Sequence, residues 1–577
     1  MLVFGDQILV ASPRPVAREL ERVLTELASR PAGIDRHSAL VAAFIDASEL
    51  TQGLADAECA TTGIETRGLV GDVAMSMLLA LARQIAESWR SGFQFCPHPP
   101  RTLGVLRMLP MPDVVNLRQA EGHAYYAVYP EAYLEAATAA VARHPGPRHV
   151  IGIRSIGTGL AAMVAAATDA GLPATVRPRG DPFRRTVQVS EALAAEWRAH
   201  PDTTIAVVDE GPGMSGSSFG AVVDTLEDLG ITRIECFPSH RGELGAMASE
   251  RHRVRWQRLP RHVVEVDQLL VDTDLLAGWI ADIVGPLLGP LEDLSAGAWR
   301  ALRFRDDRMW PASVTFQERR KFLARTSDAA WLARFVGLGR AGARSLTRAR
   351  TLHAAGFTPP IAGLCHGFLL ERWFDDAVPL DLRLYERPAL VGHVARYLAL
   401  RSSILITAEP GASLPKLLEM ARHNTTLALG ARTAAAFDRF APRLASLARS
   451  VRAIEIDGRL HVWEWLVRAD GSLVKTDALD HHAAHDLVGC QDLTWDLAGA
   501  GYELEMSHHE QHRLASTVAA ITGRAHDPEL LRFMRLCYLA FQLGRHALAI
   551  DTADAAEAVR LRLITDRYAA ALGTALR

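Results

Sequence analysis

Cysteine is scarce and scattered in this sequence, and its pattern excludes two kinds of protein. The chain has six cysteines in 577 residues, and no two of them form a C-x-x-C pair. Disulfide frameworks and thiolate zinc sites both require cysteines at short, paired spacings. The pattern therefore argues against a disulfide-stapled secreted domain and against a thiolate zinc site, and it predicts a cytoplasmic location.

An excess of charge and long apolar runs are also missing. Lysine and arginine total 63 against 66 acidic residues, for a net charge of -3. This balance argues against a dedicated nucleic-acid binder. Apolar runs such as 73–81 and 284–288 fall short of the roughly 20 residues of a membrane span, and the first residues lack the pattern of a secretory leader. We expect small-molecule partners, with no nucleic acid and no membrane.

The order of the predicted elements indicates an α/β and α+β multidomain protein. At roughly 150 residues per domain, the length fits two to four domains. We expect a helical N-terminal region over 1–105, with apolar residues at helical spacing in 14–28 and 69–89. A parallel-sheet domain is expected over 106–290. A bilobal, helix-rich domain is expected over 298–577, after a linker near 286–297.

Strand and helix alternate in the middle of the chain. Strands are expected at 149–155, 203–211 and 232–239, and helices at 159–171 and 219–229. An extended piece over 125–129 and a helix over 130–142 precede them. Such alternation predicts a parallel sheet that binds its ligand at the carboxyl ends of the strands.

The most informative motif is the loop from Asp209 to Ser218, which separates a buried strand from a helix. Small residues allow backbone N–H groups to approach a phosphate closely, and the helix N-terminus adds partial positive charge. Hydroxyls in the loop can add donors. The acids Asp209 and Glu210 are placed to hold ribose hydroxyls or a magnesium-bound diphosphate. The residues expected to cradle phosphate are Ser215, Gly216, Ser217 and Ser218.

This loop resembles the motif that binds phosphoribosyl diphosphate (PRPP) in type I phosphoribosyltransferases, where an acidic pair precedes a Thr-Gly-x-Thr turn. The resemblance implies that Asp209 and Glu210 are catalytic and hold Mg²⁺, with PRPP as a substrate. The loop has one residue more than the family pattern between the acids and the turn.

An earlier loop supports the same resemblance, because the family binds pyrophosphate in a strand-loop-helix unit that lies earlier in the domain. The matching residues here are Arg154, Ser155, Gly157 and Thr158, and Arg154 is expected to neutralise diphosphate charge. The segment 176–185 stands where the family has a mobile flap. It carries Arg177, Arg179, Arg184 and Arg185, of which Arg184 and Arg185 are expected to bind the anionic substrate.

The C-terminal half resembles the aminoglycoside phosphotransferase-type kinases. The matching segments follow in the family's order over 344–373, 457–467, 473–481 and 491–500. Asp496-Leu497-Ala498 matches the family's structural Asp-Leu-Ala turn. The resemblance implies ATP as a substrate and Mg²⁺ held by Asp477 or Asp480, with Lys321 as the lysine that pairs with phosphate.

The catalytic loop departs from the family pattern His-Gly-Asp-x-His-x-x-Asn. When His461 is matched to the second histidine, Arg459 stands in place of the catalytic Asp and Glu464 in place of the metal-binding Asn. Asp457 lies two residues early. A phosphoryl transferase needs an acceptor-orienting carboxylate and metal ligands. Three interpretations stay open: a kinase with shifted acids (Asp457 and Asp477 catalytic; Asp477, Asp480 and Glu464 metal-binding), a domain that only binds its ligand, or an unrelated helical fold.

Histidines cluster at 480–486, directly after the predicted metal-binding Asp. His481 and His485 are four residues apart and would share one face of a helix, as metal-binding pairs do. The competing interpretation is a polar loop whose histidines only donate and accept hydrogen bonds.

Together these patterns predict a bifunctional cytoplasmic enzyme that transfers a phosphoribosyl group from PRPP to a small acceptor and phosphorylates a related molecule. A sensor that binds both nucleotides without turnover is the main alternative, and a kinase-only enzyme is a third. A homodimer is left open.

Overall fold

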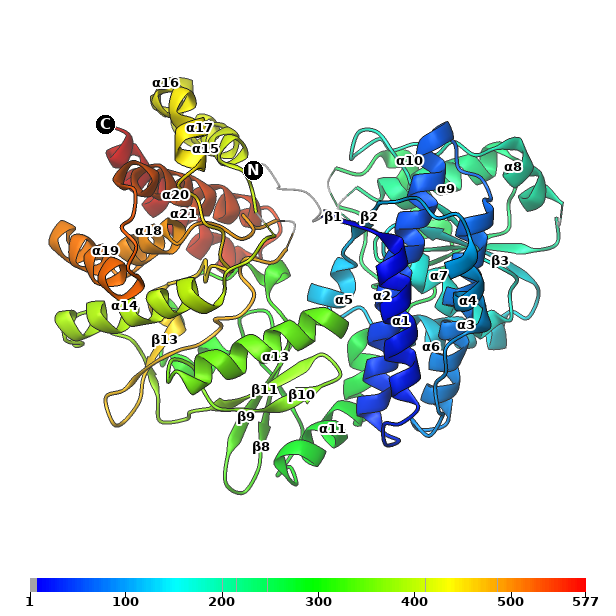
Figure 1. Cartoon of the computed structure of the whole chain (residues 1–577), viewed down its shortest axis with the longest axis horizontal. Helices are drawn as coiled ribbons and strands as arrows, with labels where there is room; N and C mark the ends of the chain where they lie inside the picture. The colour runs from blue at the N-terminus through cyan, green and yellow to red at the C-terminus, as the bar shows by residue number, and fades with distance from the viewer. Residues whose placement is uncertain (1–7, 200, 214, 246, 410, 485) are drawn as a thin grey trace.

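Two groups of elements lie side by side in the computed structural model, which describes residues 8–577 except residues 200, 214, 246, 410 and 485 (Figure 1). The group from residue 8 to 284 surrounds a parallel sheet, and we call it the parallel-sheet half. The group from residue 292 to 577 has an antiparallel sheet and a block of helices, and we call it the two-lobed half.

The first hundred residues are mainly helical, as predicted. They form α1 (Pro13–Leu27), α2 (Ile34–Thr62), α3 (Leu69–Arg90) and α4 (Arg101–Met108). In α1 the apolar side chains recur every three or four residues, so they share one buried face. By contrast, α2 is buried on nearly all sides and packs against α1, α3 and α7.

By length and composition, α3 is apolar enough to cross a membrane, which the short apolar runs of the sequence did not predict. Within the fold, 61% of its apolar window is buried. A helix in a protein core passes the same test, and α3 packs against α2 and α7. Core packing therefore accounts for its composition.

The parallel sheet has the strand order β4-β3-β5-β6, with every neighbouring pair parallel. Its strands are β3 (Arg148–Ile153), β4 (Ala174–Val176), β5 (Thr204–Val208) and β6 (Ile234–Phe237). The three predicted strands are confirmed, although each is shorter than expected. α7 (Gly157–Thr168) follows β3 and α9 (Ser217–Asp228) follows β5, so both helices begin at the carboxyl edge of the sheet.

An antiparallel sheet of order β10-β11-β9-β8-β7 forms the smaller lobe of the two-lobed half. Its strands are β7 (Glu292–Asp293), β8 (Lys321–Arg325), β9 (Ala330–Phe335), β10 (Ile361–Cys365) and β11 (Phe368–Trp373). The helix α13 (Gly339–Ala354) joins β9 to β10. The smaller lobe of the predicted bilobal arrangement is therefore present.

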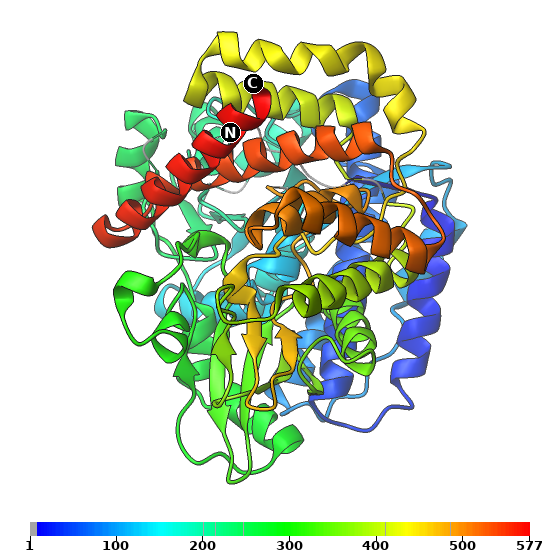
Figure 2. The ribbon, with the colours of Figure 1, turned by 90° about the vertical axis from the view of Figure 1, so that its left-hand side faces the viewer.

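The larger lobe is helical and lies above the strands in Figure 2. Its main helices are α14 (Arg387–Ile404), α15 (Leu414–Leu429), α18 (Thr494–Glu503), α19 (His508–Thr522), α20 (Pro528–Ile550) and α21 (Ala555–Leu576). A small sheet of order β12-β13-β14 borders the smaller lobe, with strands β12 (Val378–Pro379), β13 (Trp465–Val467) and β14 (Leu473–Lys475).

One local expectation is wrong. The predicted extended piece at 125–129 instead follows the short helix α5 (Glu121–Tyr125) and leads directly into α6 (Pro130–Arg143). Elsewhere, residues 315–317 form a 3-10 turn before β8 begins at Lys321. Ala435–Arg443 is also 3-10, and its Pro442 cannot donate to an α-helical ladder.

One apolar core joins the two halves. It contains residues of α2, α3 and α7 together with Phe322, Phe335, Phe368 and Leu370 from the antiparallel sheet. Phe335 is fully buried and lies 5.6 Å from the ring of Phe368 and 6.0 Å from that of Tyr129, measured between ring centroids. The halves are therefore packed against each other through apolar side chains.

We expect Phe335→Ala to lower the free energy of unfolding by about 3–5 kcal/mol, because it removes a buried ring and leaves a cavity between the halves. Urea denaturation of the full chain measures this. The matched control is Phe316→Ala, at a ring that is 48% exposed, which should change stability little. Equal effects of the two variants would contradict the packing role of Phe335.

Candidate functional site

Two loops meet at the carboxyl edge of the parallel sheet. One joins β3 to α7 and the other joins β5 to α9. A methyl group added to Gly152 would meet the carbonyl oxygen of Gly157 at 2.2 Å, and one added to Gly157 would meet that of Val208 at 2.6 Å. Only glycine allows this approach. The two predicted phosphate-binding loops therefore lie next to each other.

The arginine-rich segment lies over the second loop. The hydroxyls of Ser215 and Ser217 donate to the carbonyl oxygen of Pro182 at 3.2 and 2.6 Å. The guanidinium of Arg185 donates to the hydroxyl of Ser218 at 3.3 Å. Gly216 has a φ of 62° just before α9 begins. The segment predicted as a flap is thus in contact with the loop that it was expected to cover.

Asp209 stands between the two loops. Burial raises the pKa of its carboxyl to about 7, while Arg185 and Arg177 act in the opposite direction. The hydroxyl of Tyr133 donates to its backbone carbonyl at 2.8 Å, which fixes the end of the strand. The carboxylate of Glu210 lies against Gly122 and makes further contacts. Asp209 is therefore the acid that is best placed to meet a ligand here.

Arg154 has a different place from the one predicted. Its guanidinium donates to Asp56 at 2.9 Å and to Glu65 at 2.6 Å, and its side chain is 2% exposed. Arg177 also pairs with Asp56, at 2.6 Å. Both arginines therefore pair with acids of the N-terminal helical region, and these ion pairs hold the loop after β3 in place. The diphosphate contact predicted for Arg154 gains no support from this geometry.

The other residues predicted at this edge of the sheet differ in burial and in hydrogen bonding. Thr158 is fully buried, and its hydroxyl has no hydrogen-bond partner among the described residues. The carbonyl oxygen of Ser155 accepts the N–H of Thr158 at 3.1 Å. Arg184 is exposed on the covering segment. Of the four arginines, Arg185 is the one that reaches the phosphate loop.

A second candidate site lies in the cleft between the two lobes of the C-terminal half. Arg334 on β9 is 1% exposed, and its guanidinium lies 2.6 Å from Asp477, 3.4 Å from Asp480 and 3.5 Å from Glu371. In protein kinases the third strand of this lobe carries a lysine, and β9 is third when counted from β7. The sequence analysis missed Arg334. A charged residue inside the apolar strand AWLARF was its only signal.

Lys321, the predicted phosphate-pairing lysine, lies on β8. Its ammonium group is 3.5 Å from the carboxylate of Glu318. The side chain still lines the cleft. Lys321 therefore remains a candidate contact, although Arg334 occupies the position that the strand order assigns to the family's lysine.

Asp496 anchors the loop that stands where a catalytic loop is expected. Its carboxylate accepts the backbone N–H groups of Asp457 at 2.8 Å and Gly458 at 2.9 Å. Burial raises its pKa to about 6. The structural role predicted for the Asp-Leu-Ala turn agrees with these contacts.

Asp457 itself is fully buried and turned away from the cleft. Its carboxylate accepts from the hydroxyl of Tyr397 and lies 3.6 Å from the ammonium of Lys475. Lys475 also holds Glu464, at 2.7 Å. A carboxylate enclosed in this way cannot reach a substrate. The geometry therefore gives Asp457 a structural place and does not support the catalytic role predicted for it.

The acids of the cleft gather as metal ligands would, but basic groups already neutralise them. Ligand atoms of Asp477, Asp480 and His481 lie within 4.8 Å of one another. Asp477 pairs with Arg334 and lies 4.0 Å from Arg459, and Asp480 pairs with Arg319 at 3.1 Å. Together with the Lys475–Glu464 pair, these contacts give each of the three predicted metal ligands a basic partner, which Mg²⁺ would have to displace. With these ion pairs in place, the residues present do not fit a kinase magnesium site.

The histidine cluster does not form the predicted helix face, because residues 481–484 adopt turns and a bend. His481 lies 3.3 Å from the carboxylate of Asp477 and 3.9 Å from that of Asp457. His485 lies outside the described residues. The interpretation as a polar loop beside the cleft agrees better with this geometry.

The cleft encloses a cavity of about 120 Å³ with several arginines and aromatic rings in its wall. Burial lowers the pKa of Arg545 to about 9 and that of Arg303 to about 10. Among the described residues, neither has an acid within ion-pair distance: Arg545 donates to Gln317, and Arg303 to two backbone carbonyls. Buried cations without acids make this cavity suitable for an anion.

The sequence matches no family model and no curated protein. Among solved structures, the chain is similar to a choline kinase from Streptococcus pneumoniae (15% identity, 44% of this chain and 89% of that one, TM-score 0.31). It is also similar to a choline/ethanolamine kinase family protein from Mesorhizobium loti (15%, 52% and 99%, TM-score 0.31) and to a spectinomycin phosphotransferase solved with ADP and spectinomycin (13%, 52% and 97%, TM-score 0.32).

At TM-scores near 0.3 these matches establish neither a shared fold nor an activity nor a substrate. The comparisons give no support to a phosphoribosyltransferase-like domain, and that interpretation remains a prediction.

The raised pKa of Asp209 predicts a pH-dependent stability. Between the ordinary value of 3.8 and about 7, the folded chain holds this proton more tightly than the unfolded chain does. The free energy of unfolding contributed by Asp209 therefore falls as pH rises through this window. We expect Asp209→Asn to be more stable than the wild type above pH 7, with the difference vanishing near pH 4.

Denaturation of the full chain at pH 4.5, 6 and 8 measures this difference. The matched control is Asp202→Asn on the exposed turn before β5, which should show no such trend. A stability difference between Asp209→Asn and the wild type that is constant with pH would contradict the assignment.

Proposed function

We propose that the two-lobed half is a kinase-like domain that binds a nucleotide through arginine side chains, without needing Mg²⁺. The observation that carries this proposal is that the buried Arg545 and the half-buried Arg303 line the cleft and, among the described residues, have no acid within ion-pair distance. Charge-assisted hydrogen bonds from guanidinium groups to phosphate are among the strongest in proteins. Aromatic rings in the same wall, including Trp373 and Trp463, suit a flat base.

Binding is better supported than phosphoryl transfer at this site. Transfer requires a carboxylate that orients the acceptor and metal ions that bridge the phosphates. Arg459 stands where that carboxylate is expected, and Asp477 and Glu464 are held by Arg334 and Lys475. A small-molecule kinase activity is therefore the alternative to binding alone, and the ATP experiments described below distinguish the two.

A second candidate function belongs to the parallel-sheet half, where we propose a phosphoribosyl-type site that binds PRPP. The specific support is the contact of Arg185 with Ser218, next to the start of α9. The N-terminus of α9, the loop hydroxyls and Arg185 can together hold a phosphate. The buried carboxyl of Asp209 can accept from ribose hydroxyls at the end of β5.

Magnesium fits this second site better than it fits the cleft. Asp209 is half-buried and has no ion-pair partner within 4 Å among the described residues, and Glu210 follows it in the chain. These two acids would hold the ion, which would offset the charge of a leaving diphosphate. The chain would then be a transferase with one reacting site and one nucleotide-binding site. A cytoplasmic location remains part of this proposal.

The nucleotide proposal predicts that ATP binds in the presence of EDTA. Calorimetric titration should give the same affinity with EDTA and with Mg²⁺ to within about threefold. Arg545→Gln should weaken binding by about tenfold or more, since a hydrogen bond to a charged group contributes about 1.5–3 kcal/mol. The matched control is Arg449→Gln, at an exposed arginine after α17 (Leu444–Ala448).

Transfer of the γ-phosphate to a small acceptor, or binding that requires Mg²⁺, would contradict this proposal. Arg459→Asp adds the missing carboxylate and serves as a second probe. It should weaken ATP binding in EDTA, because it replaces a cation with an acid.

The phosphoribosyl proposal predicts that PRPP with Mg²⁺ raises the unfolding temperature of the chain. Asp209→Asn should abolish this effect. Arg185→Gln should weaken PRPP binding about tenfold, whereas Arg184→Gln, at an exposed neighbour, should change the affinity for PRPP little. Pyrophosphate release with a mixture of bases then separates a transferase from a sensor. Unchanged PRPP binding in Asp209→Asn would exclude the site as assigned.

A further inference from the structure

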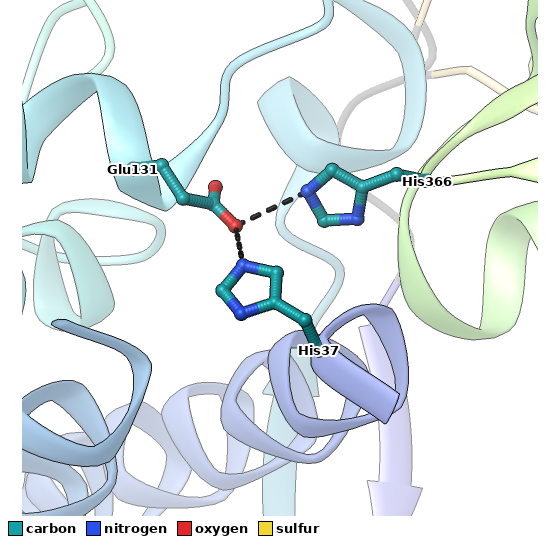
Figure 3. A group of neighbouring side chains, drawn as sticks. All are labelled: His37, Glu131 and His366. Carbon is teal, nitrogen blue, oxygen red and sulfur yellow. Dashed lines mark hydrogen bonds and ion pairs between the residues drawn. The ribbon is translucent and has the colours of Figure 1, made fainter. Parts of the chain in front are cut away.

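A buried cluster of two histidines and one glutamate lies where the two halves of the chain meet. His37 is on α2, Glu131 is in the first turn of α6, and His366 is in the turn between β10 and β11 (Figure 3). Their side chains are at most 1% exposed. Residues separated by up to 329 positions in the chain thus converge on one point.

The three side chains aim their ligand atoms at each other. The Nε2 atom of His37 lies 2.8 Å from one carboxylate oxygen of Glu131, and Nε2 of His366 lies 3.1 Å from the same oxygen. The second carboxylate oxygen of Glu131 is buried and has no hydrogen-bond partner among the described residues. One ligand atom from each residue therefore lies within 4.8 Å of the others.

Serine hydroxyls fix the orientation of both rings from behind. Nδ1 of His37 lies 2.9 Å from the hydroxyl of Ser88, and Nδ1 of His366 lies 2.9 Å from that of Ser38. Histidines that bind a metal through one nitrogen usually donate the other N–H to such an outer partner. When the serines accept these protons, both Nε2 atoms carry lone pairs directed at the cluster centre.

Among the described residues, the groups within ion-pair distance of the Glu131 carboxylate are the imidazoles of His37 and His366, and none is a lysine or arginine. Aromatic rings enclose the cluster: Phe93 lies 4.9 Å and Trp89 5.8 Å from His37, and Trp279 lies 5.5 Å from His366. A carboxylate buried in apolar surroundings is costly unless a cation pairs with it.

We propose that His37, Glu131 and His366 bind one divalent transition-metal ion, expected to be Zn²⁺, that joins the two halves. Two imidazoles and one carboxylate form a donor set that zinc uses, at bond lengths of about 2.0–2.2 Å. Small outward movements of the rings would open the donor atoms to that spacing. The ion supplies the positive charge that Glu131 lacks, and it ties α2 and α6 to the β10–β11 turn.

The first test measures the metal content of the wild-type chain. The protein is produced in zinc-supplemented medium, passed through a desalting column and analysed by inductively coupled plasma mass spectrometry. We expect about one zinc per chain, as for a preformed structural site. A chelator added during partial denaturation should remove the ion and lower the unfolding temperature, and Zn²⁺ alone should restore it.

Variants then locate the ion. Glu131→Gln and His366→Gln keep side chains of similar size and should each lose the bound zinc. His481→Gln changes a histidine that lies near Asp477 and Asp480, and His508→Gln changes an exposed histidine at the start of α19. Both of these variants should keep it. Cobalt(II) added to the metal-free wild type should give the visible absorption of a four-coordinate site, and this absorption should be absent in His366→Gln.

Two results would overturn the proposal. One is a wild-type chain that holds no transition metal and whose unfolding temperature does not respond to Zn²⁺ after refolding. The other is a bound ion that is lost in His481→Gln and kept in His366→Gln. Because the wild-type measurements need no substitution, the first of these results can be obtained even if a variant fails to fold.

Discussion

The ion pairs that Arg334 makes with Asp477 and Asp480 are the contacts on which the arrangement of the cleft depends. The guanidinium is buried on the sheet of the smaller lobe and reaches Asp477 and Asp480, which belong to the loop beneath the larger lobe. A buried arginine would be costly without these acids, and the acids would be costly without it. The ion pair therefore fixes how the lobes face each other. It also occupies the carboxylate that a kinase would give to magnesium, so the same contact that closes the fold changes the chemistry of the cleft.

The remaining basic groups of the cleft follow from this arrangement. Asp477 is already paired with Arg334, and the guanidinium of Arg459 lies 4.0 Å from the same carboxylate. Arg545 donates to the side-chain amide oxygen of Gln317. The cavity thus combines a kinase-like position with an excess of positive charge. In the parallel-sheet half, by contrast, the half-buried acid Asp209 lies next to the loop predicted to bind phosphate. The two sites are therefore suited to different parts of phosphorylated ligands.

Local pattern predicted much of this structure, because it determines strands, helices and loop chemistry. The alternation around 149–239 gave the parallel sheet, and the small residues at 209–218 gave the loop at its carboxyl edge. Asp496 was placed correctly because its turn has a specific sequence. The ion pairs of Arg154 were not predicted, because its partners Asp56 and Glu65 lie on a helix and a loop about 90 residues earlier. Arg334 and the His37–Glu131–His366 cluster were missed for the same reason: their members are far apart in the chain, and only tertiary packing brings them together.

The central claim is that the cleft binds phosphate groups with arginines in place of magnesium. A crystal structure of the chain with a non-hydrolysable ATP analogue, grown with Mg²⁺ present, tests it most directly. The account predicts phosphate oxygens within hydrogen-bond distance of Arg459 and Arg545, with Arg334 still paired to Asp477. A magnesium ion coordinated by Asp477 and Glu464, with Arg334 or Lys475 displaced, would contradict it.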